Sequence, residues 1–248
     1  MGIKTAEPKP WRAWMMGHRF TVLLCALVLL IVAVPVANAV FSRSPRLFSR
    51  LLVMICFNLM LLSALFAMSQ SRRRQIVAAL LSVPAVILQS VSILPVNDRV
   101  RAVGYVFTIV FLGYLVAVII GALFRRRAIT TDMICASICA YLLLGVCWAI
   151  VYSLIEILLP GSFSISDAHL GVSGELNVSG AESQFALYYS FITLSTLGYG
   201  DMIPINPVSR VFSYCEAVTG QIYLAVLVAR LVGLHISQAL GGGSKGSD

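Results

Sequence analysis

The sequence contains few charged residues for its length. Only 11% of its 248 residues are Asp, Glu, Lys or Arg, whereas 59% are hydrophobic, and the mean hydropathy is +0.93. Soluble domains carry about 25% charged residues, so this composition excludes an ordinary soluble globular fold. It predicts a chain that lies mostly inside a lipid bilayer.

The sequence also lacks the residue patterns of enzyme sites. Its three histidines, at positions 18, 169 and 235, are scattered. No nucleophile stands beside a base, and no phosphate-binding glycine loop or zinc motif occurs. The six cysteines all fall in apolar segments and are interpreted as small buried hydrophobic residues. We therefore expect neither an enzyme nor an organic cofactor.

Six apolar segments are each long enough to cross a bilayer as a helix, which needs about 20 residues. They cover residues 20–41, 51–69, 76–96, 102–124, 133–159 and 207–234. The first is longer than the apolar part of a cleaved signal peptide, about 7 to 15 residues. We expect it to be retained as a span, with cleavage as the alternative. The predicted fold class is an all-α membrane protein with six transmembrane helices.

Basic residues outnumber acidic ones, 18 to 10, which gives a net charge of +8. They are concentrated in short clusters beside the apolar segments, such as residues 72–74 and 125–127. Clusters of this kind set membrane topology and contact lipid headgroups, so we expect membrane lipids as partners and no nucleic acid. Because basic loops stay inside the cell, both termini are predicted to be cytoplasmic, in a multi-pass protein of the cell membrane.

The hexapeptide TLGYGD at residues 196–201 lies between the last two apolar segments. Gly198 and Gly200 can adopt positive φ without penalty, which lets neighbouring carbonyls point in one direction. The preceding residues 184–195 form an amphipathic segment that is too short to span a bilayer. Non-helical backbone survives at membrane depth only where it is buried in protein or lines water. The pattern therefore predicts a re-entrant helix followed by a non-helical loop that is buried in protein or lines water.

Residues 196–201 resemble the selectivity filter of potassium channels. Residues 133–234 as a whole resemble the pore domain of these channels, in which residues 141–156 match the outer helix and residues 220–233 the inner helix of prokaryotic members. The resemblance implies the tetrameric architecture of voltage-gated-like channels. Since each chain carries one filter, the expected partners are three identical subunits. The permeant ion would be K+, bound by Thr196, Leu197, Gly198, Tyr199 and Gly200.

The predicted organisation has four parts. They are a cytoplasmic N-terminal segment (1–19), a sensor-like bundle of four helices (20–127), the pore domain (128–236) and a flexible C-terminal tail (237–248). The tail is interpreted either as native or as a cloning scar. The strongest alternatives to a potassium-selective channel are a weakly selective cation channel and a subunit of a potassium transporter.

Several residues are candidates for supporting the filter. The resemblance implies aromatic donors to Asp201 at the positions of Tyr188 and Tyr189, and we expect a contact between the Tyr188 hydroxyl and Asp201. Glu156 and Glu216 are acidic residues inside membrane spans, where ionisable groups are costly and indicate function. Glu216 is interpreted either as a buried acid that braces the filter or as a hydrogen-bonding group near the outer loop.

The sixth segment carries the predicted gate. Gly220 falls where inner helices of the family bend, and the alternative is that it permits close packing against the fifth segment. Beyond it, Gln221, Leu224 and Val228 share one helical face. We expect this face to line a cavity and to form a hydrophobic constriction at its inner end.

The first four segments lack the charges of a voltage sensor, which needs several Arg or Lys at three-residue intervals. The fourth has no charged residue between Arg101 and Arg125. Because moving one charge through 100 mV supplies about 2.3 kcal/mol, we predict that voltage has only a weak effect on opening. Open probability measured against voltage in bilayers checks this. A steepness equivalent to several gating charges per subunit would contradict it.

Overall fold

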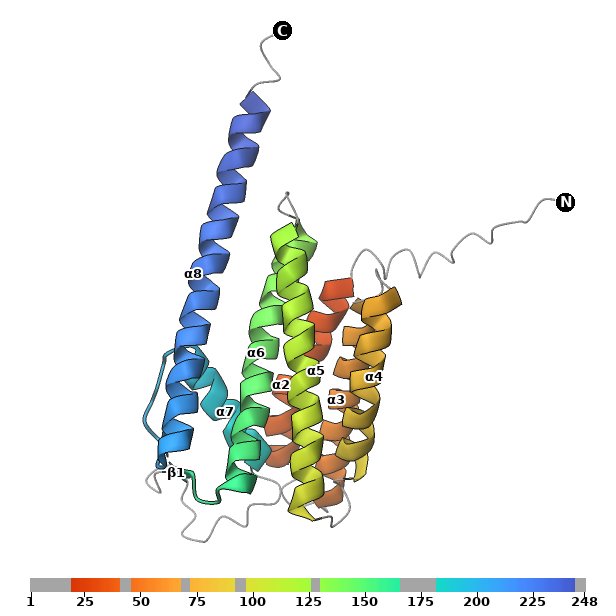
Figure 1. Cartoon of the computed structure of the whole chain (residues 1–248), viewed down its shortest axis with the longest axis vertical. Coiled ribbons are helices and arrows are strands. Elements are labelled where there is room, and N and C mark those ends of the chain that lie inside the picture. The colour runs from red at the N-terminus through yellow and green to blue at the C-terminus, as the bar shows by residue number, and fades with distance from the viewer. Residues whose placement is uncertain are drawn as a thin grey trace, which may run out of the picture.

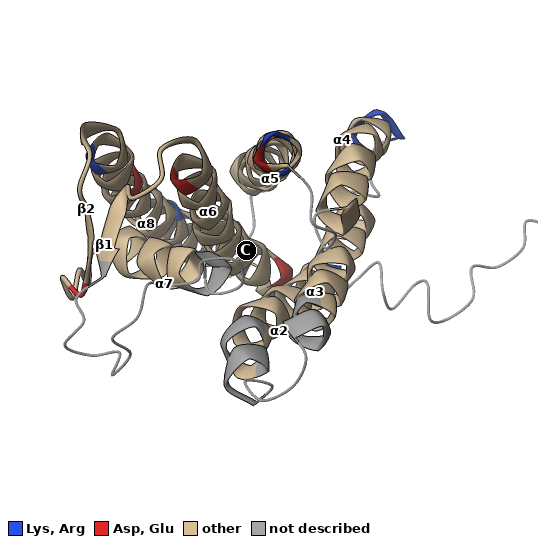
Figure 2. Ribbon diagram, turned by 90° about the horizontal axis from the view of Figure 1, so that it is seen from below, with Lys and Arg blue, Asp and Glu red and all other residues tan. Residues whose placement is uncertain are grey.

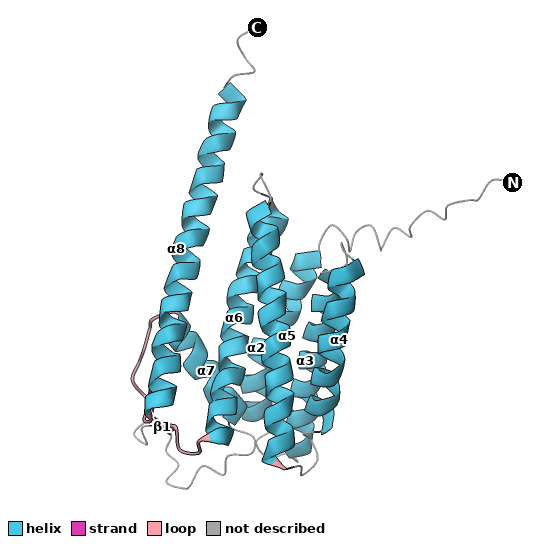
Figure 3. Ribbon diagram, viewed as in Figure 1, coloured by secondary structure: helices cyan, strands magenta, loops and turns pink. Residues whose placement is uncertain are grey.

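The computed structural model describes residues 19–40, 46–67, 72–91, 97–125, 130–165 and 182–243. These residues are almost all helical, as Figure 3 shows. The helices are α2 (Arg19–Val40), α3 (Arg46–Ala67), α4 (Arg72–Val91), α5 (Asp98–Arg125), α6 (Thr131–Leu158), α7 (Glu182–Leu194) and α8 (Pro207–Gly243). Two short strands, β1 (Phe163–Ile165) and β2 (Met202–Pro204), pair in antiparallel register.

The helices predicted from apolar segments are confirmed, with ends that differ by a few residues. The largest difference is at α8, which continues to Gly243 instead of ending at Leu234. Among the described residues, four helices are long and apolar enough to cross a membrane: α4, α5, α6 and residues Pro207–Ile236 of α8. Helices α2 and α3 contain shorter apolar stretches, Arg19–Ala33 and Leu51–Ala67.

Helices α2 to α6 stand side by side, and the short α7 lies obliquely between α6 and the lower half of α8 (Figure 1). In the view along the helices, α7 and α8 lie at one side of the molecule and α4 at the other (Figure 2). Leu23 of α2, Met60 of α3, Phe111 of α5 and Leu143 of α6 have no exposed surface. An apolar core therefore ties the first helices to α6, which borders the region around α7.

Polar side chains cap the starts of α6 and α8, the two helices on either side of α7. Thr130 accepts a hydrogen bond from the backbone N–H of Met133 (3.2 Å), which caps the start of α6. Oδ1 of Asn206 accepts from the N–H of Ser209 (2.8 Å), and Pro207 follows as the first residue of α8. An Asn cap followed by Pro is a strong start signal, because the first helical N–H groups have no partner within the helix.

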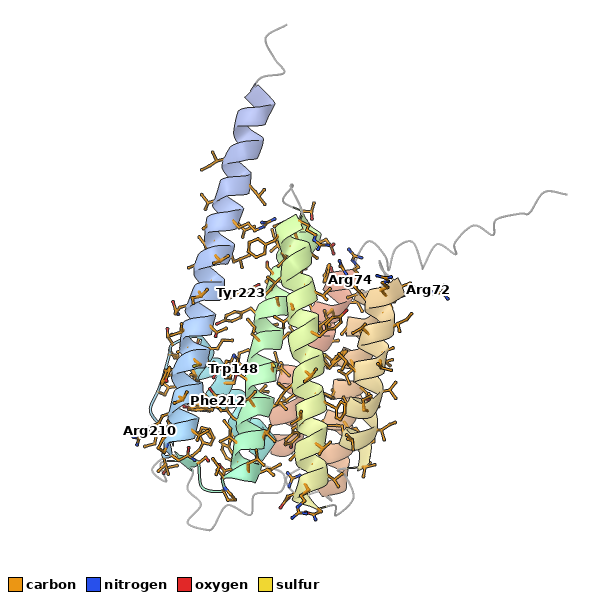
Figure 4. All side chains as sticks on the ribbon, in the orientation of Figure 1. Arg72, Arg74, Trp148, Arg210, Phe212 and Tyr223 are labelled. Atoms are coloured by element: carbon orange, nitrogen blue, oxygen red, sulfur yellow. The ribbon has the colours of Figure 1, made fainter. Side chains whose placement is uncertain are left out.

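Charged side chains mark the ends of the helices. In Figure 4, Arg72 and Arg74 lie at one end of the bundle and Arg210 at the opposite end. Trp148 and Phe212, which form an edge-to-face pair with ring centroids 6.2 Å apart, lie between α6 and α8 and between these two ends. Apart from Glu216 and Arg230 of α8, the charged residues of the described helices lie near helix ends, which fits helices that cross a bilayer.

Gly220 does not break α8, which continues through this position as one helix (Figure 1). A Cβ atom placed at Gly220 would overlap the backbone carbonyl of Leu194 at the end of α7. The glycine therefore permits close packing, as one sequence interpretation held, but its partner is α7 and not the fifth segment, α6. Gly145 of α6 permits close packing between α6 and α7 in the same way, since a Cβ there would lie 2.7 Å from the ring of Phe191 in α7.

We predict that Gly220→Ala destabilises the protein by about 1–3 kcal/mol, the usual cost of overpacking, because α7 must move away from α8. Gly233→Ala is the matched control, since a Cβ at Gly233 meets nothing within 4 Å. It should stabilise α8 by up to about 1 kcal/mol. Thermal unfolding in detergent micelles measures both changes. Equal effects of the two substitutions would show that Gly220 does not mediate close packing.

Candidate functional site

The backbone between α7 and β2 alternates in handedness. Thr196, Gly198 and Gly200 have φ values of 58°, 51° and 79°, whereas Leu197 and Tyr199 between them do not have positive φ. In a regular strand successive carbonyls point to opposite sides, and alternating the sign of φ turns them to the same side. The positive φ expected at the two glycines is confirmed. The segment thus presents a row of backbone oxygens.

Thr196 is the unexpected member of this row. It is the one residue other than glycine with positive φ in the part of the chain that the structure describes. Such a conformation costs of order 1–3 kcal/mol, so the surroundings must hold it. The N–H of Thr196 donates to the carbonyl of Thr193 (2.9 Å), and the N–H of Leu197 donates to Ile192 (2.8 Å). Nε2 of Gln221 on α8 donates to the Thr196 hydroxyl (3.2 Å).

The outer end of the row is tied to α7. The Tyr188 hydroxyl donates to Oδ2 of Asp201 (2.6 Å), so the contact expected from the sequence is present. This hydrogen bond raises the pKa of Tyr188 to about 12, from an ordinary value at which the hydroxyl is already protonated at neutral pH. Oδ1 of the same carboxylate accepts from the N–H of Met202 (3.1 Å). Asp201 therefore joins three elements: α7, β2 and the segment Thr196–Gly200, which we call the filter segment.

Tyr189 does not share the contact of Tyr188 and packs among other residues. It is buried, and its ring makes edge-to-face contacts with Tyr152 and Phe163, at centroid distances of 5.0 and 5.1 Å. Its hydroxyl lies 2.7 Å from Oγ of Ser213. Since Ser213 donates its single proton to the carbonyl of Ser209 (2.7 Å), Tyr189 must be the donor. The two neighbouring tyrosines thus hold two different faces of α7.

The two acidic residues of the pore region occupy different places. Glu156 accepts hydrogen bonds from the N–H groups of Gly161 (2.7 Å) and Ser162 (3.1 Å), and so holds the turn that leads from α6 to β1. Its link to the filter segment is indirect. It runs through the pairing of β1 with β2 and through Ser162, whose carbonyl accepts from the N–H of Ile205 (2.8 Å). Glu216 is completely buried and contacts the hydroxyls of Tyr152 and Ser190. Hydrogen bonding at the outer turn therefore belongs to Glu156, and Glu216 lies behind α7.

The predicted pore-lining residues are on the exposed side of α8. Gln221, Leu224 and Val228 are all exposed. On the opposite side, the Tyr223 hydroxyl donates to the carbonyl of Ser137 in α6 (2.6 Å), and Figure 4 shows Tyr223 pointing from α8 toward α6. One face of α8 thus packs on α6 of the same chain, and the other is open.

The filter carbonyls are the candidate cation ligands. Within the described ranges, no three His, Cys, Asp or Glu side chains gather in a way that could hold a metal ion. Carbonyl dipoles facing one side can replace the hydration shell of a monovalent cation when several copies surround a common axis. The side chains of Leu197 and Tyr199 are 55% and 68% exposed, so both are free to contact such copies.

Residues 137–235 match the ion channel family model. The match supports an ion channel whose characteristic part comprises α6, α7, the filter segment and α8. It covers less than half of the chain and leaves α2 to α5 outside. No curated protein and no solved structure matches this chain.

Two features of the site were not predicted from the sequence. One is the positive φ of Thr196, because a residue other than glycine gives no sign in the sequence that it adopts this conformation. The other is the role of Ser190 as a partner of Glu216. Ser190 stands two positions after Tyr188, so it lies on the opposite face of α7. The available signal was a polar residue inside the apolar stretch Phe185–Leu194.

We predict an energetic coupling between Tyr188 and Asp201 of about 0.5–1.5 kcal/mol, the net contribution of a typical hydrogen bond. A double-mutant cycle with Tyr188→Phe and Asp201→Asn, read by thermal unfolding, measures it. Tyr214 on α8, which is 58% exposed, provides the control pair with Asp201 and should show no coupling. A coupling energy between Tyr188 and Asp201 as small as that of the control pair would contradict the structural role of this contact.

Proposed function

We propose that this protein is a subunit of a homotetrameric, potassium-selective channel. The observation that carries the proposal is the alternation of φ from Thr196 to Gly200, which directs successive carbonyls to one side. Four such strands around a common axis would bind dehydrated K+ between the carbonyls of Thr196, Leu197, Gly198 and Tyr199. One filter segment per chain requires four chains, and the exposed side chains of Leu197 and Tyr199 support neighbours around the axis.

In the proposed membrane arrangement, α2, α3, α4, α5, α6 and α8 are spans and α7 is a re-entrant pore helix. The protein lies in the cell membrane with both termini in the cytoplasm, in contact with membrane lipids. Large apolar residues along α8, such as Val218, Ile222 and Val232, are more than half exposed in the single chain. Contacts with neighbouring subunits and lipid would cover them.

The proposed ion path runs from the outer end of the filter to the open face of α8. Asp201 carries negative charge at the outer end, and four copies would raise the local cation concentration. Gln221 stands at the inner end, where it already contacts the Thr196 hydroxyl. Beyond it, Leu224 and Val228 would form the apolar lining at which the path closes by losing water. The protein moves ions passively and catalyses no reaction.

The deciding experiment is a measurement of bi-ionic reversal potentials with purified protein in planar bilayers. A strong preference for K+ over Na+ is expected. A small preference would favour the weakly selective cation channel, and absence of single-channel currents together with slow, saturable K+ uptake would favour a transporter subunit. Either result would reject the proposal.

Gly198→Ala should abolish K+ selectivity or current, because a side chain in this left-handed conformation costs about 1–2 kcal/mol and the carbonyl would turn away. Gly161→Ala is the matched control. Gly161 also has positive φ, 78°, but it lies in the turn after α6. Its replacement brings similar backbone strain and should leave the permeability ratio unchanged. Preserved selectivity in Gly198→Ala would count against the filter assignment.

A further inference from the structure

A chain of polar groups is buried between α6, α7 and α8. Glu216 of α8 and Ser190 of α7 have no exposed surface, and Tyr152 of α6 is 1% exposed. The Tyr152 hydroxyl donates to Oε2 of Glu216. Oε1 of Glu216 lies 2.5 Å from Oγ of Ser190, and this Oγ lies 2.7 Å from the carbonyl oxygen of Gly145 in α6.

The number of protons in this chain can be counted. A serine hydroxyl has a single proton to donate, and a backbone carbonyl can only accept. The contact with Gly145 therefore uses the proton of Ser190. If Ser190 accepts at its other short contact, where Oγ and Oε1 are 2.5 Å apart, the proton in that contact comes from Glu216.

We propose that Glu216 is a neutral carboxylic acid that donates its proton to Ser190 and thereby positions the pore helix α7 between α6 and α8. The hydrogen bonds then run in one direction, from Tyr152 to Glu216, from Glu216 to Ser190 and from Ser190 to Gly145. Every donor has an acceptor, and the carboxyl group uses both oxygens.

The surroundings favour the neutral form. Both oxygens of Glu216 face hydroxyl groups and neither faces a cation. An isolated charge without a compensating partner is strongly disfavoured in an apolar interior. The neighbouring ring contacts of Tyr152 with Phe163 and Tyr189 are apolar and exclude water from this place.

The assignment of the proton does not depend on which ion passes through the protein. The consequence for selectivity does rest on the proposed function. Ser190 stands in the same helix as Ile192, whose carbonyl accepts from the N–H groups of Leu197 (2.8 Å) and Gly198 (3.1 Å). A displacement of α7 at Ser190 would therefore be transmitted to the filter segment. Glu216 is a positioning residue in this sense.

Infrared difference spectroscopy of the full-length protein in lipid bilayers at neutral pH tests the proton assignment. The wild-type protein minus Glu216→Gln should show the carbonyl stretch of a protonated carboxylic acid, which shifts in deuterated water. Glu156→Gln is the control, because Glu156 accepts two backbone N–H groups and its loss should remove a carboxylate band instead. Loss of a carboxylate band with Glu216→Gln would overturn the proposal.

Two further variants keep the carboxyl group and so protect the test against misfolding of Glu216→Gln. Tyr152→Phe removes the donor to Oε2, and Ser190→Ala removes the acceptor at Oε1. Each should move the protonated-acid band to higher frequency, because one hydrogen bond is lost. An ionised Glu216 would give no band at this position in either variant, and the proposal would fail.

The positioning role is read from bi-ionic reversal potentials of the same preparations. Glu216→Gln can still donate through its amide and should retain more of the wild-type preference for K+ than Glu216→Ala or Ser190→Ala. Equal selectivity of all four proteins would reject the positioning role. A wild-type protein without K+ preference would reject the proposed function, whereas the infrared band would still report the proton on Glu216.

Discussion

The structure depends on one constraint, the need to hold a row of backbone carbonyls on one side of the segment from Thr196 to Gly200. Carbonyls so arranged cannot pair with a neighbouring strand, and positive φ at a residue other than glycine costs about 1–3 kcal/mol. Two glycines reduce the backbone cost, but Thr196 retains it. Hydrogen bonds to Ile192 and Thr193 at the end of α7, and the Gln221 contact from α8, keep the segment in this shape. The position of α7 therefore decides the geometry of the filter segment.

The close approach of helices fixes α7 in turn. Gly145 and Gly220 let it approach α6 and α8 more closely than any larger residue would permit. Two tyrosines then hold α7 in this position. Tyr188 donates a hydrogen bond to Asp201, and Tyr189 packs against the ring of Tyr152. Since interiors are close-packed, a small movement of α8 at Gly220 must move Leu194 and the residues that follow it. This contact couples the helix with the proposed gate directly to the filter segment.

The sequence alone was sufficient for the helices, including the short α7, and for the positive φ of Gly198 and Gly200, because length, hydropathy and the lack of a side chain are local properties. It was insufficient where the answer depends on which element lies opposite. The partner of Gly220 is α7 and not α6, and a glycine in a sequence does not indicate what approaches it. Glu156 and Glu216 are both acids in apolar segments, yet one holds an outer turn and the other is enclosed. Only the packing of three helices separates these two roles.

The distribution of charge around the filter segment follows from the same packing. Asp201 is joined to Tyr188 at the outer end, where water can reach a carboxylate, whereas Glu216 lies behind α7 between hydroxyl groups. A negative charge on Glu216 would act through a medium of low dielectric constant, in which electrostatic interactions are several times stronger than in water. It would therefore compete with the carbonyl dipoles for the cation and distort the balance among neighbouring sites. In the proposed channel, a protonated Glu216 would supply hydrogen bonds and add no net charge, so the carbonyl row and Asp201 would dominate the attraction felt by a cation.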